Sequence, residues 1–227
     1  GFRVIFSNGT SISYPALGSI VVPFAAAPDL RGTNRFVAPR DFIWENGQPF
    51  DLVGHGTHVS GTIGQNTNNG VGTAGIAYNV RLMPVKVIDD VWDLIFGAPN
   101  EGTDDTVARG VRYAADNGAK VFNMSIGRTG PPAPVVEDAI KYAVGKGAFV
   151  AIASGNGFED GNLTEVIAEI ASRVQGAVSV AALDQQHNRA YYSTTGSWVE
   201  LSAPGGSFRT LGPAGEVYQQ TYDLSFV

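Results

Sequence analysis

The chain has 227 residues with a formal net charge of −6, of which 44% are hydrophobic and 16% charged, and it contains no cysteine. This length and apolar content suffice for one domain with a substantial core. The absence of cysteine excludes disulfides and thiolate metal sites. Scattered basic residues in an acidic chain argue against a nucleic-acid partner. No apolar run reaches the ~20 residues of a membrane helix, so we expect no membrane partner. We also expect a monomer.

A turn at residues 28–32 and a loop to about Asp51 precede a predicted helix that begins at His55 and ends near Gln65. Most positions of this helix are Gly, Ser, Thr or Val, and such small residues allow a neighbouring backbone to approach closely. Imidazole accepts and returns a proton near neutral pH. His55 is therefore a candidate general base. The alternative is a partly buried histidine held by a local hydrogen bond.

Predicted strands and helices alternate through the rest of the chain. We expect strands at 80–88, 119–124, 148–153 and 177–184, and helices at 103–117 and 134–146. The loop at 89–102 forms either one wall of a peptide groove or a cap on the sheet edge. Strands alternating with helices of this length indicate right-handed βαβ units and a parallel sheet. The sequence thus predicts an α/β fold whose site lies beyond the carboxyl ends of the strands.

Polar segments follow two of these strands. One strand ends in Asn123-Met124-Ser125-Ile126-Gly127, and the next leads into Ser154-Gly155-Asn156-Gly157. An amide N–H directed into a cleft at a strand's carboxyl end can stabilise a developing oxyanion, and the loss of one such donor typically costs ~10²–10³ in rate. Asn156 is therefore a candidate oxyanion donor. The alternative is an asparagine that takes a left-handed turn conformation.

Several segments resemble, in order, motifs of the subtilisin-like serine proteases (subtilases). They are Pro28-Asp29-Leu30, His55-Gly56-Thr57-His58-Val59-Ser60-Gly61, Asn123-Met124-Ser125-Ile126-Gly127, Ala153-Ser154-Gly155-Asn156 and Ala203-Pro204-Gly205. The resemblance implies a three-layer fold with a mainly parallel sheet and helices on both faces. It also implies that His55 is the base and Asn156 the oxyanion donor. A substrate peptide would add a strand along Ser125, Ile126 and Gly127 and contact Gly155.

The resemblance also implies a structural calcium site. In many relatives the carboxylate matching Asp29 binds calcium, and Asn68 and Asn69 lie in the loop at 66–70, where the family has its calcium loop. Amide and carbonyl oxygens are hard ligands that suit Ca²⁺. Because this loop contains no carboxylate, Asp29 has to supply charge from outside it. The alternative is a plain Asn-rich turn.

Two members of the family's catalytic triad are absent from their usual places. Counting back from Asp29 by the family's spacing reaches Ile20, and no Asp or Glu precedes Asp29. Without a carboxylate on its Nδ1, His55 loses the group that holds its tautomer, and that loss can cost ~10⁴ in turnover. The family's Gly-Thr-Ser-Met-Ala-x-Pro motif does not occur after Gly206.

The stretch Asn8-Gly9-Thr10-Ser11-Ile12-Ser13-Tyr14-Pro15 resembles this missing serine motif. On this hypothesis the chain is circularly permuted: Ser11 opens a helix at the site, attacks the substrate and gives its proton to His55. The objection is that only 16 residues separate Ser11 from Pro28. The alternative is a truncated chain with a foreign amino terminus. We therefore divide the chain into an atypical segment, 1–27, and a subtilase-like domain, 28–227, that is incomplete at its carboxyl end.

We predict an extracellular hydrolase that cleaves peptide bonds, and also carboxylic esters, by serine acyl transfer. Esters are included because their cleavage needs less leaving-group assistance. One alternative is an inactive pseudo-protease or fragment that retains the scaffold and the peptide groove. Another is a metal-dependent hydrolase built on His55, His58 and Asp51, because histidines three residues apart share a helical face.

Overall fold

The computed structural model describes residues 2–5, 11–14, 27–32, 34–51, 53–88 and 102–219. The strands are β1 (Phe2–Ile5), β2 (Ser11–Tyr14), β3 (Arg40–Asp41), β4 (Val85–Lys86), β5 (Val121–Met124), β6 (Phe149–Ala153), β7 (Ala177–Leu183) and β8 (Leu201–Pro204). The α-helices are α1 (His55–Gly64), α3 (Asp104–Asp116), α4 (Pro134–Gly145), α5 (Val166–Glu169) and α6 (Phe208–Leu211). Short 3₁₀ helices are η1 (Pro28–Leu30), η2 (Ile170–Arg173) and η3 (Gly212–Gly215).

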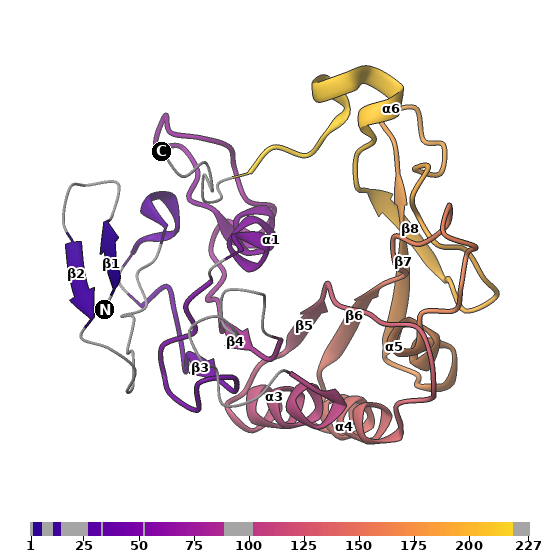
Figure 1. The fold of residues 1–227 in the computed structure, drawn as a ribbon, viewed down its shortest axis with the longest axis horizontal. Helices are drawn as coiled ribbons and strands as arrows, with labels where there is room; N and C mark the ends of the chain where they lie inside the picture. The colour runs from indigo at the N-terminus through magenta and orange to yellow at the C-terminus, as the bar shows by residue number, and fades with distance from the viewer. Residues whose placement is uncertain are drawn as a thin grey trace.

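The main sheet has the order β5-β6-β7-β8, and each neighbouring pair is parallel. Helices α3 and α4 lie side by side along one face of this sheet, whereas α1 lies on its other side, near β4 (Figure 1). All four strands therefore end at one edge. The prediction of an α/β fold with a parallel sheet and helices is confirmed.

Alternating residues of the central strands form the core. Val150 and Ile152 of β6 are fully buried, and Ile140 of α4 covers them from the helical layer. Helix α3 presents Val107 and Val111 to the same core, because residues four apart share one face of a helix. The side chain of Thr103 caps α3 by accepting a hydrogen bond from the backbone of Thr106.

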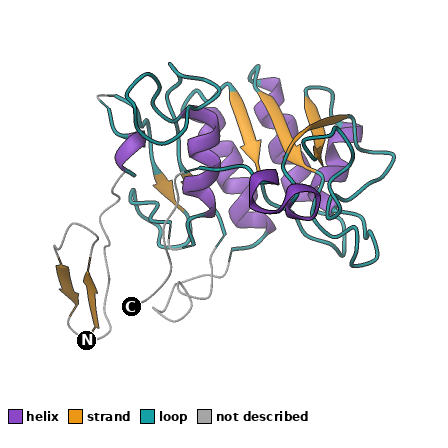
Figure 2. Cartoon of the chain, turned by 90° about the horizontal axis from the view of Figure 1, so that it is seen from above, coloured by secondary structure: helices purple, strands orange, loops and turns teal. Residues whose placement is uncertain are grey.

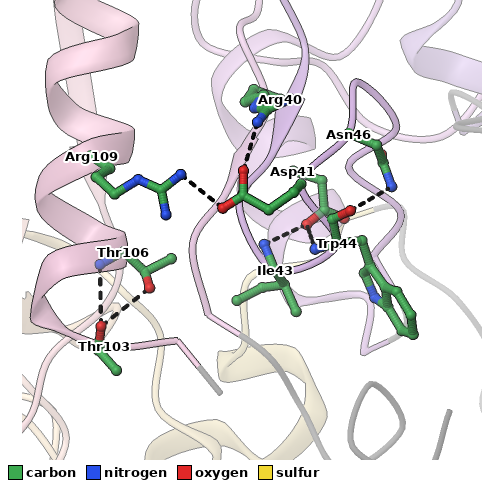
Figure 3. A network of polar contacts seen from close by, with 9 residues as sticks. Arg40, Asp41, Ile43, Trp44, Asn46, Thr103, Thr106 and Arg109 are labelled. Carbon is green, nitrogen blue, oxygen red and sulfur yellow. Dashed lines mark hydrogen bonds and ion pairs between the residues drawn. The ribbon is translucent and has the colours of Figure 1, made fainter. Parts of the chain in front are cut away.

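A polar network joins the small β3–β4 sheet to α3. The carboxylate of Glu45, in the turn after β3, accepts one hydrogen bond from Arg40 of β3 and one from Arg109 of α3, each at 2.7 Å (Figure 3). Asp41 holds the same turn closed, because its Oδ1 accepts the backbone N–H groups of Ile43 and Trp44 at 2.8 and 2.9 Å. These contacts set β4 beside the helical layer.

A cavity of about 1270 Å³ separates β4 from β5, and residues of both strands line it. Among the described residues each of these strands pairs on one side only, so the two parallel sheets face each other across this space. Strand β4 is shorter than the predicted strand at 80–88. Its regular pairing starts only after Pro84, which has no N–H to donate to a ladder.

The amino-terminal hairpin differs from the prediction. Ser11 begins strand β2, which pairs with β1 in antiparallel register, and it does not open a helix. The alternation Ser-Ile-Ser-Tyr has the period of a strand, and Ile and Tyr favour strands. The hairpin stands apart from the main sheet in both views (Figures 1 and 2). Most of the loop predicted at 89–102 lies outside the described residues. None of the helices in the described ranges is long and apolar enough to span a bilayer.

Candidate active site

Helix α1 begins at the cavity, and Asp51 organises its first turn. The Asp51 carboxylate accepts the backbone N–H of Gly54 at 2.9 Å, and both the N–H and the hydroxyl of Thr57 at 2.7 Å. These bonds satisfy donors that a helix leaves open at its N-terminus, where negative charge is also favourable. Gly54 has a φ of 85°, a conformation that glycine adopts without strain. His55 follows directly, is exposed, and lines the cavity.

The carboxylates nearest to His55 in sequence are bound by other donors. Asp51 caps α1, Asp41 accepts backbone N–H groups, and Asp29 accepts from side-chain amides. Within the ranges that the structure describes, no carboxylate lies within hydrogen-bond distance of the His55 ring. The imidazole therefore has no carboxylate partner there to hold its tautomer.

The metal-dependent alternative does not agree with this geometry. His58 places Nε2 3.1 Å from the carbonyl oxygen of Val217, and both carboxylate oxygens of Asp51 face the start of α1. In the described part of the chain, no three His, Asp or Glu side chains are grouped as metal ligands would be. His55, His58 and Asp51 therefore do not form the metal site of that hypothesis.

The end of β5 offers a backbone edge to the same cavity. The carbonyl of Lys120 accepts the N–H of Phe149 on β6. Because backbone groups alternate in direction along a strand, those of Asn123 and Ser125 face away from β6. Ser125, Ile126 and Gly127 line the cavity together with His55. The predicted peptide edge and the candidate base thus border one space.

The turn that carries Asn156 is fixed by Thr194. The N–H of Thr194 donates to the carbonyl of Gly155 at 2.9 Å, and its Oγ1 accepts the N–H of Gly157 at 3.0 Å. Thr194 is fully buried, whereas Asn156 is exposed. Gly155 has a φ of 105°, in the region that favours glycine. The two bonds hold the backbone on either side of Asn156, whose exposed side chain is not among the residues that line the cavity.

Glu165, the residue before α5, lies between the two strand-end segments. A Cβ built on Gly127 would lie 2.7 Å from its Oε2, and a Cβ built on Gly155 would lie 2.8 Å from its Oε1. The Glu165 side chain therefore contacts both strand-end segments. Desolvation by burial raises the pKa of the Glu165 carboxyl. Sequence reasoning found neither Glu165 nor Thr194, because no local pattern connects them to the motifs that they contact.

The proposed calcium ligands are only partly brought together. Asp29 is 3% exposed, and its oxygens accept the side-chain amides of Gln65 at 2.6 Å and Asn69 at 2.5 Å. Asn68 is exposed and has a φ of 59°. Gln65 Oε1 is buried and has no hydrogen-bond partner among the described residues. The amide N–H groups of Gln65 and Asn69, and not their oxygens, therefore face the Asp29 carboxylate beside η1.

Ser11 is described only as the first residue of β2. Its side chain lies outside the described part of the structure, and so does the predicted contact of its hydroxyl with His55.

Comparison with known proteins agrees with this architecture. The model of the subtilase family matches residues 28–226. Thermitase of Thermoactinomyces vulgaris is 36% identical over 178 residues, which cover 78% of this chain and 58% of that protein. The thermophilic serine proteinase of Bacillus sp. (strain AK1) is also 36% identical over 178 residues, covering 78% of this chain and 40% of that protein. The chain thus spans about half the length of the curated relatives it matches.

Solved structures show the same fold. The structure of fervidolysin from Fervidobacterium pennivorans, a keratinolytic enzyme related to subtilisin, superposes with a TM-score of 0.67 at 29% identity, covering 81% of this chain and 27% of that one. A protease from Pseudoalteromonas arctica gives a TM-score of 0.64 at 28% identity, covering 82% of this chain and 61% of that one. On the family match and these relatives, the chain belongs to the subtilase family.

Proposed function

We propose that this chain is a serine hydrolase that cleaves extended peptides by acyl transfer and also accepts carboxylic esters. The observation that carries the proposal is the single cavity bordered by His55 and by the backbone edge at Ser125–Gly127. A peptide added as a strand along that edge would lie in the same space as a base able to activate a nucleophile.

Each proposed group has a defined task. A serine hydroxyl attacks the scissile carbonyl carbon and transfers its proton to His55. The Asn156 amide donates a hydrogen bond to the oxyanion. The imidazolium then protonates the leaving amine or alkoxide, and water hydrolyses the acyl-enzyme by the reverse sequence. Because no described carboxylate holds the imidazolium, esters, whose leaving groups need less help, should react faster than amides.

The nucleophile that we propose is Ser11, on the support of its Gly-Thr-Ser motif. Labelling of the full chain with a serine-directed phosphonate tests this assignment, because the reagent needs a serine activated by His55. Mass spectrometry should locate the label on Ser11, and both Ser11→Ala and His55→Ala should remove it. A label on another serine would exclude Ser11 as the nucleophile but would still support a serine hydrolase.

Peptide binding without cleavage is the second candidate function. It is favoured by the His55 ring, which has no carboxylate partner within the described ranges. On this alternative the edge at Ser125–Gly127 still holds extended peptides, but no serine reacts with the phosphonate. Peptide affinity without any label would therefore decide for this alternative.

We also propose that Asp29 and Asn69 hold a structural calcium ion, together with oxygens of the neighbouring loop. The support is the buried Asp29 carboxylate and the Gln65 Oε1, which has no hydrogen-bond partner among the described residues. Asn69 donates its amide N–H to Asp29 at 2.5 Å, so its side-chain amide would have to turn to offer its oxygen to the ion. Carboxylate and amide oxygens are the ligands that Ca²⁺ prefers. With one carboxylate in the group, the affinity should lie toward the weak end of the range for protein sites.

We propose secretion as the location, on the support of the cysteine-free, acidic composition. Detection of the protein in the culture medium of its own host, compared with a cytosolic marker, tests this.

A further inference from the structure

The carboxyl group of Glu165 lies where two strand ends meet. Its Oε2 would be 2.7 Å from a Cβ on Gly127, and its Oε1 would be 2.8 Å from a Cβ on Gly155. Both contacts exist because these residues have no side chain. The carboxyl group therefore lies directly beside both backbone segments that we propose to contact substrate.

No cation pairs with this carboxylate among the residues that the structure describes. Oε2 is buried and has no hydrogen-bond partner in the described part of the chain. The nearest basic residue along this segment, Arg128, is held by Asp104, with Nε 2.8 Å from its Oδ1. A buried carboxylate without a partner is costly, and a cation that also donates hydrogen bonds removes most of that cost.

The position of Glu165 relative to the scissile bond follows from the proposed function. Asn156 marks the place of the scissile carbonyl oxygen, and the edge at Ser125–Gly127 marks the path of the peptide before it. The side chain that immediately precedes the scissile carbonyl therefore enters between Gly127 and Gly155. That entry leads onto the Glu165 carboxylate.

We propose that Glu165 selects substrates with lysine or arginine on the amino side of the scissile bond. This inference rests on the proposed function, because it uses the same groove. The cationic end of a basic side chain that enters there would donate to the Glu165 carboxylate. Norleucine has the same stem as lysine without the cation, so it would leave the carboxylate unpaired.

Peptide affinity tests the inference without requiring cleavage. The probes are acetylated tetrapeptide amides Ala-Ala-Pro-X, with lysine, norleucine or glutamate at X, titrated calorimetrically into the full chain. We expect the lysine peptide to bind about tenfold or more tightly than the norleucine peptide, the usual size of a hydrogen bond to a charged group. Glu165→Gln should abolish this preference, and Glu165→Lys should shift it to the glutamate peptide.

Glu169→Gln is the matched control, because it removes one carboxylate four residues away that instead pairs with Arg173 at 3.3 Å. Both Gln variants change the net charge of −6 equally, so a preference due to overall charge would fall equally in both. Equal binding of lysine and norleucine peptides to the wild type would overturn the inference and leave the proposed function standing. A lysine preference that persists in Glu165→Gln would do the same. If none of the peptides binds, the edge at Ser125–Gly127 does not bind peptides, and both the proposed function and the role of Glu165 are wrong.

Discussion

Replacement of Thr194 by Val should weaken the turn that carries Asn156. The substitution keeps the side-chain shape but removes the acceptor of the Gly157 N–H, which lies 3.0 Å from Thr194 Oγ1. A buried donor left without a partner costs about 1–3 kcal/mol. Because Gly157 is half-buried, we expect about 1–2 kcal/mol. For a chain of this length, that corresponds to a decrease in Tm of about 2–8 °C.

The measurement is urea unfolding, with calorimetry for Tm, on wild type, Thr194→Val and a control. Thr164→Val is the control, because Thr164 is exposed and surface substitutions usually change stability by less than about 0.5 kcal/mol. The displaced Asn156 amide should also lower turnover of an activated ester, by a factor no larger than the ~10²–10³ of a lost oxyanion donor. Unchanged stability together with unchanged turnover would refute the role of Thr194.

Three further predictions concern carboxylates. Asp51→Ala should destabilise the chain by about 0.5–2 kcal/mol in urea unfolding through loss of the α1 cap, and Asp51→Asn by less; equal effects would contradict the capping role. Added calcium should raise the Tm of the wild type but not of Asp29→Asn, and a similar rise in both would exclude Asp29 as a ligand. Burial raises the pKa of Glu165 above its usual 4.5, so the folded state favours the protonated carboxyl group. The contribution of Glu165 to folding stability is therefore complete below pH 4.5 and is lost as the pH rises through the folded-state pKa. The stability of Glu165→Gln relative to wild type should therefore increase with pH above about 4.5, and a pH-independent difference would contradict this.

Most regular elements of the fold follow from local patterns. Helix α3 could be predicted from the spacing of Val107 and Val111 and from the acidic first turn, and β6 from its unbroken apolar run. The apolar pattern at 80–88 predicts a longer strand than β4 because it takes no account of Pro84, which interrupts the pairing. The resemblance of its motif to one in the family predicts that Ser11 starts a helix, whereas the period of two along β2 indicates the strand that the structure has.

The site is less accessible to such reasoning. His55 and Asn156 could be proposed because their neighbours in sequence carry recognisable motifs. Thr194 contacts Gly155 from a distant point in the chain, and Glu165 contacts it from ten residues further along. Neither residue lies in a recognisable motif, so the local sequence does not indicate that it belongs to the site. Their roles become visible only when parallel strands bring Gly127 and Gly155 to the same edge of the sheet.

Hydrolysis of an activated ester by wild type and His55→Ala, measured on the full chain under identical conditions, tests the central claim most directly. General base catalysis contributes typically 10²–10⁴ in rate, so the account predicts a loss of at least about 100-fold in kcat/KM for His55→Ala, with His58→Ala close to wild type. Equal rates for wild type and His55→Ala would show that the imidazole at the start of α1 is not a catalytic base.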